Sequence, residues 1–198
     1  MSQHPVSPLR LVVLLSGNGS NLQAIIDSIQ AKKLPAQVVA VISNKPEAYG
    51  IIRAKNAGIP VEVLSHTHFS DRNQYDSALK DLIDKYNPDL VVLAGFMRIL
   101  STEFVEHYRH RMLNIHPSLL PKYKGLNTHQ RVLDAGEKEH GCSVHFVTPE
   151  LDDGPVILQA KIQVKEDDTA ETLAARIHEQ EHIIYPEAIR QYAENKLK

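Results

Sequence analysis

Apolar and polar positions alternate in blocks along the first hundred residues. Near-continuous apolar runs, typical of strands buried in a parallel sheet, are separated by segments in which apolar side chains recur every three to four residues, as in amphipathic helices. The expected strands are 9–17, 37–44, 59–64 and 88–96. The expected helices are 20–30, 47–58 and 71–86. Such strand–helix alternation predicts a parallel sheet with right-handed crossovers.

The pattern changes in the second half of the chain. We expect a strand with a proline-rich end, a short helix, two strands around a turn that pair antiparallel, and a final helix. Their ranges are 111–121, 129–136, 141–148, 154–164 and from about Thr169 onward, with a break or kink near Pro186. The prediction is a single α/β domain over residues 1–198. Its sheet is mostly parallel, open and Rossmann-like, with helices on both faces and an antiparallel C-terminal strand.

Composition narrows the class of protein. Of 198 residues, 42% are hydrophobic and 23% are charged, as in ordinary globular proteins. The net charge of −2 gives no long-range attraction to polyanions, so nucleic acid is not an expected partner. The single cysteine, Cys142, suits a reducing compartment. Residues 1–10 carry no secretory signature, and no apolar run approaches the roughly 18 residues of a membrane span. We therefore expect a cytoplasmic protein that does not enter a membrane.

The stretch SGNGSN, residues 16–21, joins the first expected strand to the first helix. Gly17 and Gly19 allow a tight turn, and a helix N-terminus presents N–H groups that can bind an anion. The spacing matches neither a P-loop nor G-x-G-x-x-G. A plain strand-to-helix turn is therefore as good an interpretation as an anion site. The position favours a ligand, since open α/β sheets bind ligands at the carboxyl ends of their strands.

Further polar residues lie at the end of the fifth expected strand and in a later turn. Asn114 and His116 share one face of an extended strand. An amide donor beside an imidazole suits a developing oxyanion, although a histidine at a strand end is the simpler interpretation of this pair alone. Asp152 and Asp153 occupy a turn where carboxylates commonly bond their own backbone. If one of them faces His116, it favours the protonated ring, which then acts as a donor or general acid.

Residues 178–182, HEQEH, match the H-E-x-x-H pattern of zinc proteases. A zinc site needs a third protein ligand, and a pattern with three specified positions is expected by chance. We therefore expect no metal. His66 and His68 form an H-x-H without a cysteine or carboxylate in register. His145 is expected to be buried and hydrogen-bonded, and a supporting role near the site is the less favoured alternative.

Five ordered stretches together resemble the glycinamide ribonucleotide formyltransferases, folate-dependent formyltransferases of purine biosynthesis. The stretches are SGNGSNLQAII, VVLAGFMRIL, NIHPSLLPKYKG, HGCSVHFVTPELDDGPVILQ and EQEHIIYP. The resemblance implies transfer of a formyl group from 10-formyltetrahydrofolate to the amine of glycinamide ribonucleotide, without a metal. It also implies a nucleotide-phosphate-binding half, 1–100, and a catalytic and folate-binding half, 101–198. The state of assembly is expected to be a monomer or a homodimer.

The same resemblance implies the site residues. The catalytic set is Asn114, His116 and Asp152. Gly19, Ser20 and Asn21 would hold the nucleotide phosphate, and Glu181 would contact the nucleotide at its ribose. The folate site would comprise Arg72, Met97, Arg98, Ile99, Leu100, Asn114, Thr148, Pro149, Glu150, Leu151 and Asp152. The sequence departs from the family at Lys124, Asn127 and Pro149, which concerns two binding loops and leaves the catalytic set intact.

Other functions remain open at this point. A formyltetrahydrofolate deformylase-type hydrolase uses the same N-x-H and later aspartate but carries an added N-terminal domain. Methionyl-tRNA formyltransferase shares them too and carries an added RNA-binding domain. From a different class, a non-catalytic nucleotide-binding module would use only the SGNGSN loop. That last alternative leaves Asn114, His116 and Asp152 unexplained.

Overall fold

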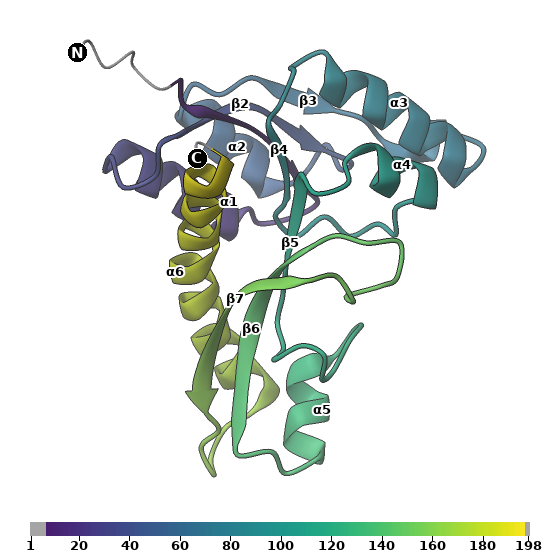
Figure 1. Cartoon of the computed structure of the whole chain (residues 1–198). Helices are drawn as coiled ribbons and strands as arrows, with labels where there is room; N and C mark the ends of the chain where they lie inside the picture. Colours follow the sequence, from purple (N-terminus) through teal and green to yellow (C-terminus); the bar gives the residue numbers. More distant parts are fainter. Residues whose placement is uncertain (1–6, 197–198) are drawn as a thin grey trace.

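A seven-stranded sheet in the order β3-β2-β1-β4-β5-β6-β7 forms the centre of the computed structural model, which describes residues 7–196 (Figure 1). Strands β1 to β5 are parallel, β6 is antiparallel to β5, and β7 is antiparallel to β6. The strands are β1 (Leu9–Leu15), β2 (Ala36–Ser43), β3 (Val61–Val63), β4 (Leu90–Leu93), β5 (Met112–His116), β6 (Glu139–Phe146) and β7 (Val156–Gln163). The predicted α/β fold with a mostly parallel sheet is confirmed.

Helices cover both faces of this sheet. They are α1 (Ser20–Gln30), α2 (Tyr49–Asn56), α3 (Arg72–Asp84), α4 (Thr102–His107), α5 (Thr128–Asp134) and α6 (Ala170–Lys196), with a 3-10 turn η1 (His66–His68). Helices α1, α2 and α6 pack on one face, and α3 and α4 pack on the other. Helix α4 was not predicted, because six residues are too few to show a helical repeat. A break or kink was predicted near Pro186; the break is wrong, because α6 continues through that residue.

The apolar run of β1 contributes to both halves of the core. Leu11, Val13 and Leu15 face the side of α1 and α6, whereas Val12 and Leu14 face the side of α3 and α4. All five side chains have no exposed surface. A fully buried side chain of this size stabilises the fold by roughly 1.5–3 kcal/mol. Burial on both faces is therefore the reason that this strand lacks the alternation of a half-exposed one.

Three loops meet at the carboxyl edge of the sheet, where the order of strands reverses between β1 and β4. The loops follow β1, β4 and β5, which are neighbours in the sheet. Ser16 joins two of them: its hydroxyl donates to Asn44 Oδ1 at 2.6 Å and accepts the Met97 N–H at 2.8 Å. Such a reversal leaves a crevice that binds ligands in open α/β sheets. The fold thus gathers the three polar loops at one edge of the sheet, where proteins of this architecture bind ligands.

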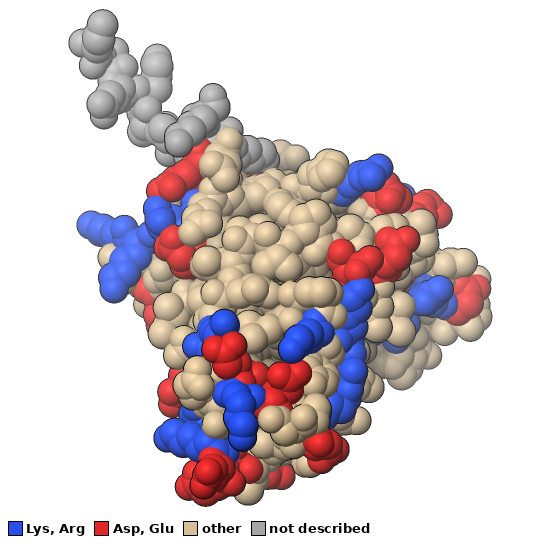
Figure 2. Space-filling model, turned by 60° about the horizontal axis from the view of Figure 1, so that its bottom comes forward, with Lys and Arg blue, Asp and Glu red and all other residues tan. Residues whose placement is uncertain are grey.

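Basic and acidic side chains are interleaved on the end of the molecule that carries α5 and the β7–α6 turn (Figure 2). Lys161 pairs with Glu139 at 3.0 Å, and Lys122 pairs with Glu137 at 3.0 Å. Mixed charges largely cancel at a distance, so this face presents no uniform field to a polyanion.

Two expectations, on a secretory signature and on the outer limits of the domain, involve residues at the chain ends that the structure does not describe. None of the helices in the described part of the chain combines the length and the apolar character that a membrane crossing requires. The predicted absence of a secretory signature concerns residues 1–10, of which 1–6 lie outside the described residues. The predicted outer limits of the domain, at residues 1 and 198, lie outside them as well.

The Tyr185 hydroxyl connects α6 to the sheet by hydrogen bonding, and removal of this hydroxyl tests its contribution to stability. Its hydroxyl lies 2.7 Å from the Leu93 carbonyl and 3.1 Å from the Leu113 carbonyl, in a fully buried setting. We expect Tyr185→Phe to lower the free energy of unfolding by about 1–3 kcal/mol, because the buried carbonyls lose this donor. Urea denaturation measures the change. Tyr192→Phe is the control, since that hydroxyl lies 3.5 Å from Asp89 O; equal losses in both variants would contradict the expectation.

Candidate active site

His116 and Asp152 form a buried pair at the carboxyl end of β5. His116 Nδ1 lies 3.5 Å from Asp152 Oδ2, and both side chains are only 8% exposed. The distance is that of an ion pair and is longer than a good hydrogen bond. Asn114 lies two residues earlier on the same strand and therefore on the same face. The structure thus brings together the three residues that the resemblance assigned to catalysis.

The backbone of the DDG turn decides which carboxylate faces the histidine. Asp152 has a positive φ of 51°, and its Oδ2 accepts the Gly125 N–H at 2.9 Å. A Cβ on Gly154 would lie 1.7 Å from the Phe146 carbonyl oxygen, so only glycine allows the turn to approach β6 this closely. Asp153 instead pairs with the partly exposed Lys124. Asp152 is therefore the one that faces the ring.

Both nitrogens of the His116 ring face hydrogen-bond acceptors. Nε2 lies 2.9 Å from the Tyr123 carbonyl oxygen, and Nδ1 faces the Asp152 carboxylate. A carbonyl can only accept, so Nε2 carries a hydrogen. The Nε2 hydrogen is a donor that the oxygen of a bound ligand could accept in place of the Tyr123 carbonyl.

The loop between β5 and α5 is tied to the DDG turn on the far side of His116. Lys124 contributes an ion pair with Asp153, and Gly125 contributes the hydrogen bond to Asp152. Arg131 donates to the Lys124 carbonyl at 2.7 Å. Lys124, at which the sequence departs from the family pattern, therefore adds an ion pair between this loop and the DDG turn. Asn127, the second departure, has a φ of 56° and begins α5.

The SGNGSN loop is closely packed against α2. A Cβ on Gly19, whose φ is 75°, would lie 2.6 Å from Gly50 Cα. Arg53 of α2 donates to the Asn18 carbonyl at 2.8 Å and to Asn18 Oδ1 at 2.8 Å. No side chain among the described residues caps α1, so the N–H groups of its first turn, at Ser20 onward, have no side-chain partner there.

Arg53 was missed by the analysis of the sequence, although a signal was present. The helix at 47–58 follows a strand that neighbours β1 in this type of sheet, so its start must lie beside the SGNGSN loop. An arginine on that helix brings a positive charge to the loop.

Asn21 and Glu181 meet beneath this loop. Asn21 Nδ2 donates to Glu181 Oε2 at 3.2 Å, and both side chains are buried. Asn21 Oδ1 is buried without a hydrogen-bond partner among the described residues. Burial raises the pKa of Glu181, against the opposing effects of nearby His178 and the Asn21 hydrogen bond. A buried carboxylate and an unused acceptor beside an uncapped helix start suit a ligand that offers hydroxyl donors.

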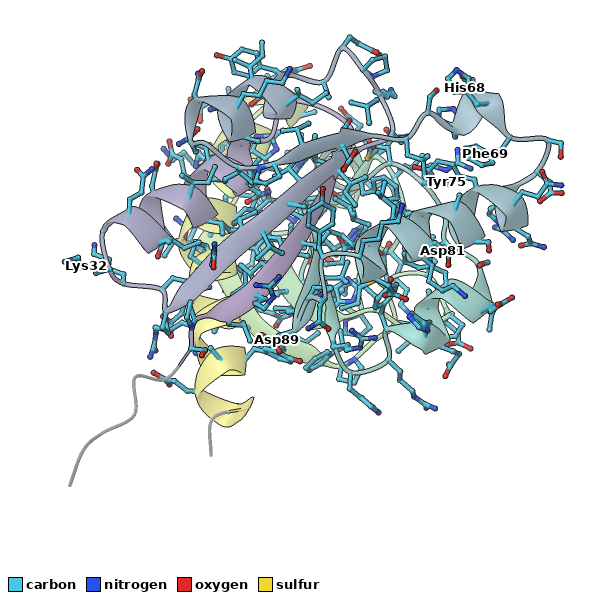
Figure 3. The ribbon with its side chains drawn as sticks, turned by 90° about the horizontal axis from the view of Figure 1, so that it is seen from above. Lys32, His68, Phe69, Tyr75, Asp81 and Asp89 are labelled. Carbon is cyan, nitrogen blue, oxygen red and sulfur yellow. The ribbon has the colours of Figure 1, made fainter. Side chains whose placement is uncertain are left out.

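The segment after β4 forms another side of the crevice. Met97 and Ile99 are 67% and 64% exposed, and the Arg98 guanidinium lies 4.7 Å from the centre of the Tyr75 ring. Figure 3 shows Phe69 close to Tyr75 of α3. The centres of their rings are 5.5 Å apart, in an edge contact. Burial raises the pKa of the Tyr75 hydroxyl to about 12.

The remaining residues that the resemblance assigned to the folate site lie at the start of α3, after β4 and in the turn after β6. Arg72 is exposed at the first position of α3, and Leu100 is half-buried. In the turn after β6, Thr148 Oγ1 donates to the Glu150 carbonyl at 3.3 Å, Pro149 is exposed, and Leu151 is 58% exposed. Exposed apolar side chains on both sides of a crevice are typical of a ligand-binding surface.

Two cavities lie away from these residues. One, of about 270 Å³, is lined by Phe146, Ile157, Tyr192 and Asn195. The other, of about 470 Å³, lies at the amino edge of the sheet near Arg10. Neither contains the His116 pair, so the candidate site rests on its chemistry and not on the size of a cavity.

The histidines of HEQEH and His145 suggested sites other than the His116 pair. In HEQEH, His178 and Glu179 are exposed on α6 while Glu181 is buried. Within residues 7–196, no three His, Cys, Asp or Glu side chains gather where a metal ion could be held. The zinc interpretation thus lacks its third ligand in that part of the chain. His145 is buried and hydrogen-bonded to Phe146 and Asn114, as expected.

Comparison with known proteins identifies the family. A family model described as formyl transferase matches residues 9–189. The chain belongs to the formyl transferase family. It is 56% identical over 190 residues to the phosphoribosylglycinamide formyltransferase of Escherichia coli (strain K12), a match that covers 96% of this chain and 90% of that protein. The resemblance predicted from the sequence is confirmed.

Solved structures of this formyl transferase family have the same fold as the chain. The phosphoribosylglycinamide formyltransferase from Coxiella burnetii superimposes with a TM-score of 0.91 at 56% identity, covering 95% of this chain and 88% of that one. The glycinamide ribonucleotide transformylase 1 from Symbiobacterium toebii gives 0.93 at 45% identity, covering 96% and 89%.

The burial of Glu181 leads to a prediction about stability and pH. A carboxyl whose folded-state pKa is raised contributes most stability below its ordinary value of 4.5 and loses that contribution as the pH rises through the folded-state value. A glutamine stays neutral, accepts the Asn21 N–H and offers a donor to Asn21 Oδ1. We therefore expect unliganded Glu181→Gln to melt at a higher temperature than the wild type at pH 8, with a gap that narrows toward pH 4.5.

Scanning calorimetry at a series of pH values checks this expectation. Glu179→Gln is the matched control, because Glu179 is exposed on the same helix. A similar shift in both variants, or a gap that widens as the pH falls, would show that burial of Glu181 does not cost stability.

Proposed function

We propose that the chain transfers the formyl group of 10-formyltetrahydrofolate to the primary amine of glycinamide ribonucleotide, also called phosphoribosylglycinamide, in de novo purine biosynthesis. The observation that carries the proposal is the buried His116–Asp152 pair, which lies beside Asn114 at the end of β5. The SGNGSN loop and the segment Met97–Leu100 follow β1 and β4 at the same carboxyl edge of the sheet. Membership of the formyl transferase family and the names of the similar proteins support the reaction.

On the nucleotide side, the uncapped start of α1 binds the phosphate through Gly19, Ser20 and Asn21. Three features support this assignment: the free N–H groups, the positive end of the helix and the nearby Arg53. Glu181 accepts hydrogen bonds from the ribose hydroxyls, a role that accounts for a buried carboxylate with a single amide donor.

On the folate side, the backbone of Met97–Leu100 and the turn 148–152 enclose the flat ring system. The exposed apolar side chains of Met97, Ile99 and Leu151 support this assignment, because they would be buried by a bound ring. Arg72, exposed at the start of α3, offers a positive charge to the carboxylate tail of the folate.

The reaction needs a donor to the oxygen of the formyl group. The neutral amine attacks the formyl carbon, and the oxygen becomes an anion. The bond to the folate nitrogen then breaks, the amine loses a proton, and the folate nitrogen gains one, so that no net proton is released. His116 donates its Nε2 hydrogen to that oxygen, exchanging the Tyr123 carbonyl that it contacts in the free protein. Asn114 donates beside it, and Asp152 holds the ring from the Nδ1 side.

The remaining parts of the proposal follow from this chemistry and from the composition. The reaction needs no metal, because an N-formyl donor is already activated for attack. Residues 1–100 supply the nucleotide-phosphate side, and residues 101–198 supply the catalytic groups and most of the folate side. The chain works in the cytoplasm as a monomer or homodimer, with small molecules and no nucleic acid as its partners.

Removal of the His116 ring tests the proposed donor. We expect His116→Ala to lower kcat by about 100- to 1000-fold, the usual effect of losing one oxyanion donor. The Kd values of both substrates should change little, because the interaction forms mainly in the transition state. Steady-state kinetics and calorimetric titration measure the two effects. His107→Ala, on α4, is the control; matching losses in binding and in kcat would exclude the proposed role.

The dependence on the amine separates the proposed transferase from the alternatives. We expect the wild-type protein to release tetrahydrofolate from 10-formyltetrahydrofolate only when glycinamide ribonucleotide is present, with formylated nucleotide formed in equal amount. Absorbance of the folate product and mass analysis of the nucleotide measure the two products. Release without the amine would instead support a deformylase-type hydrolase. Binding of the nucleotide without any product would support a non-catalytic module.

A further inference from the structure

A second histidine, His145, is in contact with the catalytic amide. It lies on β6 directly opposite Asn114 in the antiparallel pairing with β5, and it is 2% exposed. Its Nε2 lies 3.3 Å from Asn114 Nδ2, and its Nδ1 lies 2.9 Å from the Phe146 carbonyl oxygen. We propose that His145 is a positioning residue that fixes which edge of the Asn114 amide faces the reacting formyl group. This inference rests on the proposed function.

The hydrogen-bond partners determine where the His145 ring carries its hydrogen. A carbonyl can only accept, so the hydrogen is on Nδ1, where it is donated to Phe146. Burial lowers the pKa of His145, with a smaller contribution in the same direction from His116, while the Phe146 hydrogen bond and the charge of Asp152 act the other way. The buried ring is therefore neutral, and its Nε2 is a bare acceptor.

A bare acceptor at Nε2 allows only one orientation of the Asn114 amide. The nitrogen of the amide donates to Nε2; after rotation by 180°, the amide oxygen would face Nε2, and two acceptors would meet in a buried place. Within the described residues, the Asn114 side chain makes no other hydrogen bond. The second hydrogen of its Nδ2 is thus left to donate to the formyl oxygen. Without His145, nothing in the described contacts distinguishes the two orientations.

The pairing of the strands supports a built arrangement. Asn114 and His145 occupy directly opposed positions on β5 and β6, and the next pairing, between β6 and β7, is irregular between Val144 and His145. Irregularities of this kind commonly re-aim a side chain beside an active site. The alternative is that His145 only ties the end of β6 through its bond to Phe146.

Two substitutions separate positioning from a purely structural role, because each keeps one half of the ring. His145→Asn places an amide nitrogen where Nδ1 lies and keeps the bond to Phe146, but it leaves nothing at Nε2. His145→Gln reaches the Nε2 position with an oxygen that accepts from Asn114, but it loses the bond to Phe146. If His145 positions the amide, the Asn variant loses kcat by about 10- to 100-fold with unchanged KM values, and the Gln variant retains most of the activity. A purely structural role predicts the opposite order, which would overturn the proposal.

A double-mutant cycle gives a second test. If His145 acts through Asn114, then His145→Asn added to Asn114→Ala costs no further kcat, because the amide to be oriented is already gone. A full additional loss in the double variant would overturn the proposal. The Gln variant decides alone if the Asn variant fails to fold: a 10-fold or greater fall in its kcat would also contradict it.

The tautomer can be observed without any activity. Long-range nitrogen–proton spectra of the labelled wild-type protein should show a neutral histidine ring with its hydrogen on Nδ1 whose signals are lost in His145→Gln, which assigns them to His145. A hydrogen on Nε2, or on both nitrogens at neutral pH, would refute the inference whatever the reaction. Absence of formyl transfer by the wild type would refute only the proposed function.

Discussion

The candidate site depends on the close approach of the turn at Asp152–Gly154 to the end of β6. Two residues allow this approach: Gly154, where there is no room for a Cβ, and Asp152, which has a positive φ. Together they place one carboxylate against a histidine on a different strand, in a setting where both groups are buried. A buried charge needs a partner, so neither group could be kept in place without the other. The turn therefore fixes the position of His116 and places a carboxylate against its Nδ1 atom.

Much of the arrangement could be predicted from the sequence because it follows from local patterns. The strands and the long helices are set by burial and by amphipathic spacing, and the juxtaposition of Asn114 and His116 follows from the period of an extended strand. The family resemblance assigned Asp152, but the local pattern alone did not choose between Asp152 and Asp153, because that choice depends on how near the turn comes to Phe146.

Contacts between distant segments were also beyond the sequence pattern. The Tyr123 carbonyl that accepts from His116 is a backbone group, and any residue could supply it. Helix α6 continues through Pro186, although a proline inside a helix usually breaks or kinks it, because the surrounding residues pack against the sheet. Tertiary packing decides such cases, and a short window of sequence does not contain it.

The order of the strands has a consequence for substrate choice. The SGNGSN loop extends from β1 and His116 ends β5, with β4 between them. Neighbouring strands lie about 4.8 Å apart, so the helix end that is proposed to bind the phosphate and the histidine are separated by two such steps, roughly 10 Å. The sheet therefore sets the distance that a substrate must span between the start of α1 and His116. Compounds whose anionic group and nucleophilic nitrogen are much closer together cannot reach both ends at once, whatever the affinity of either group alone.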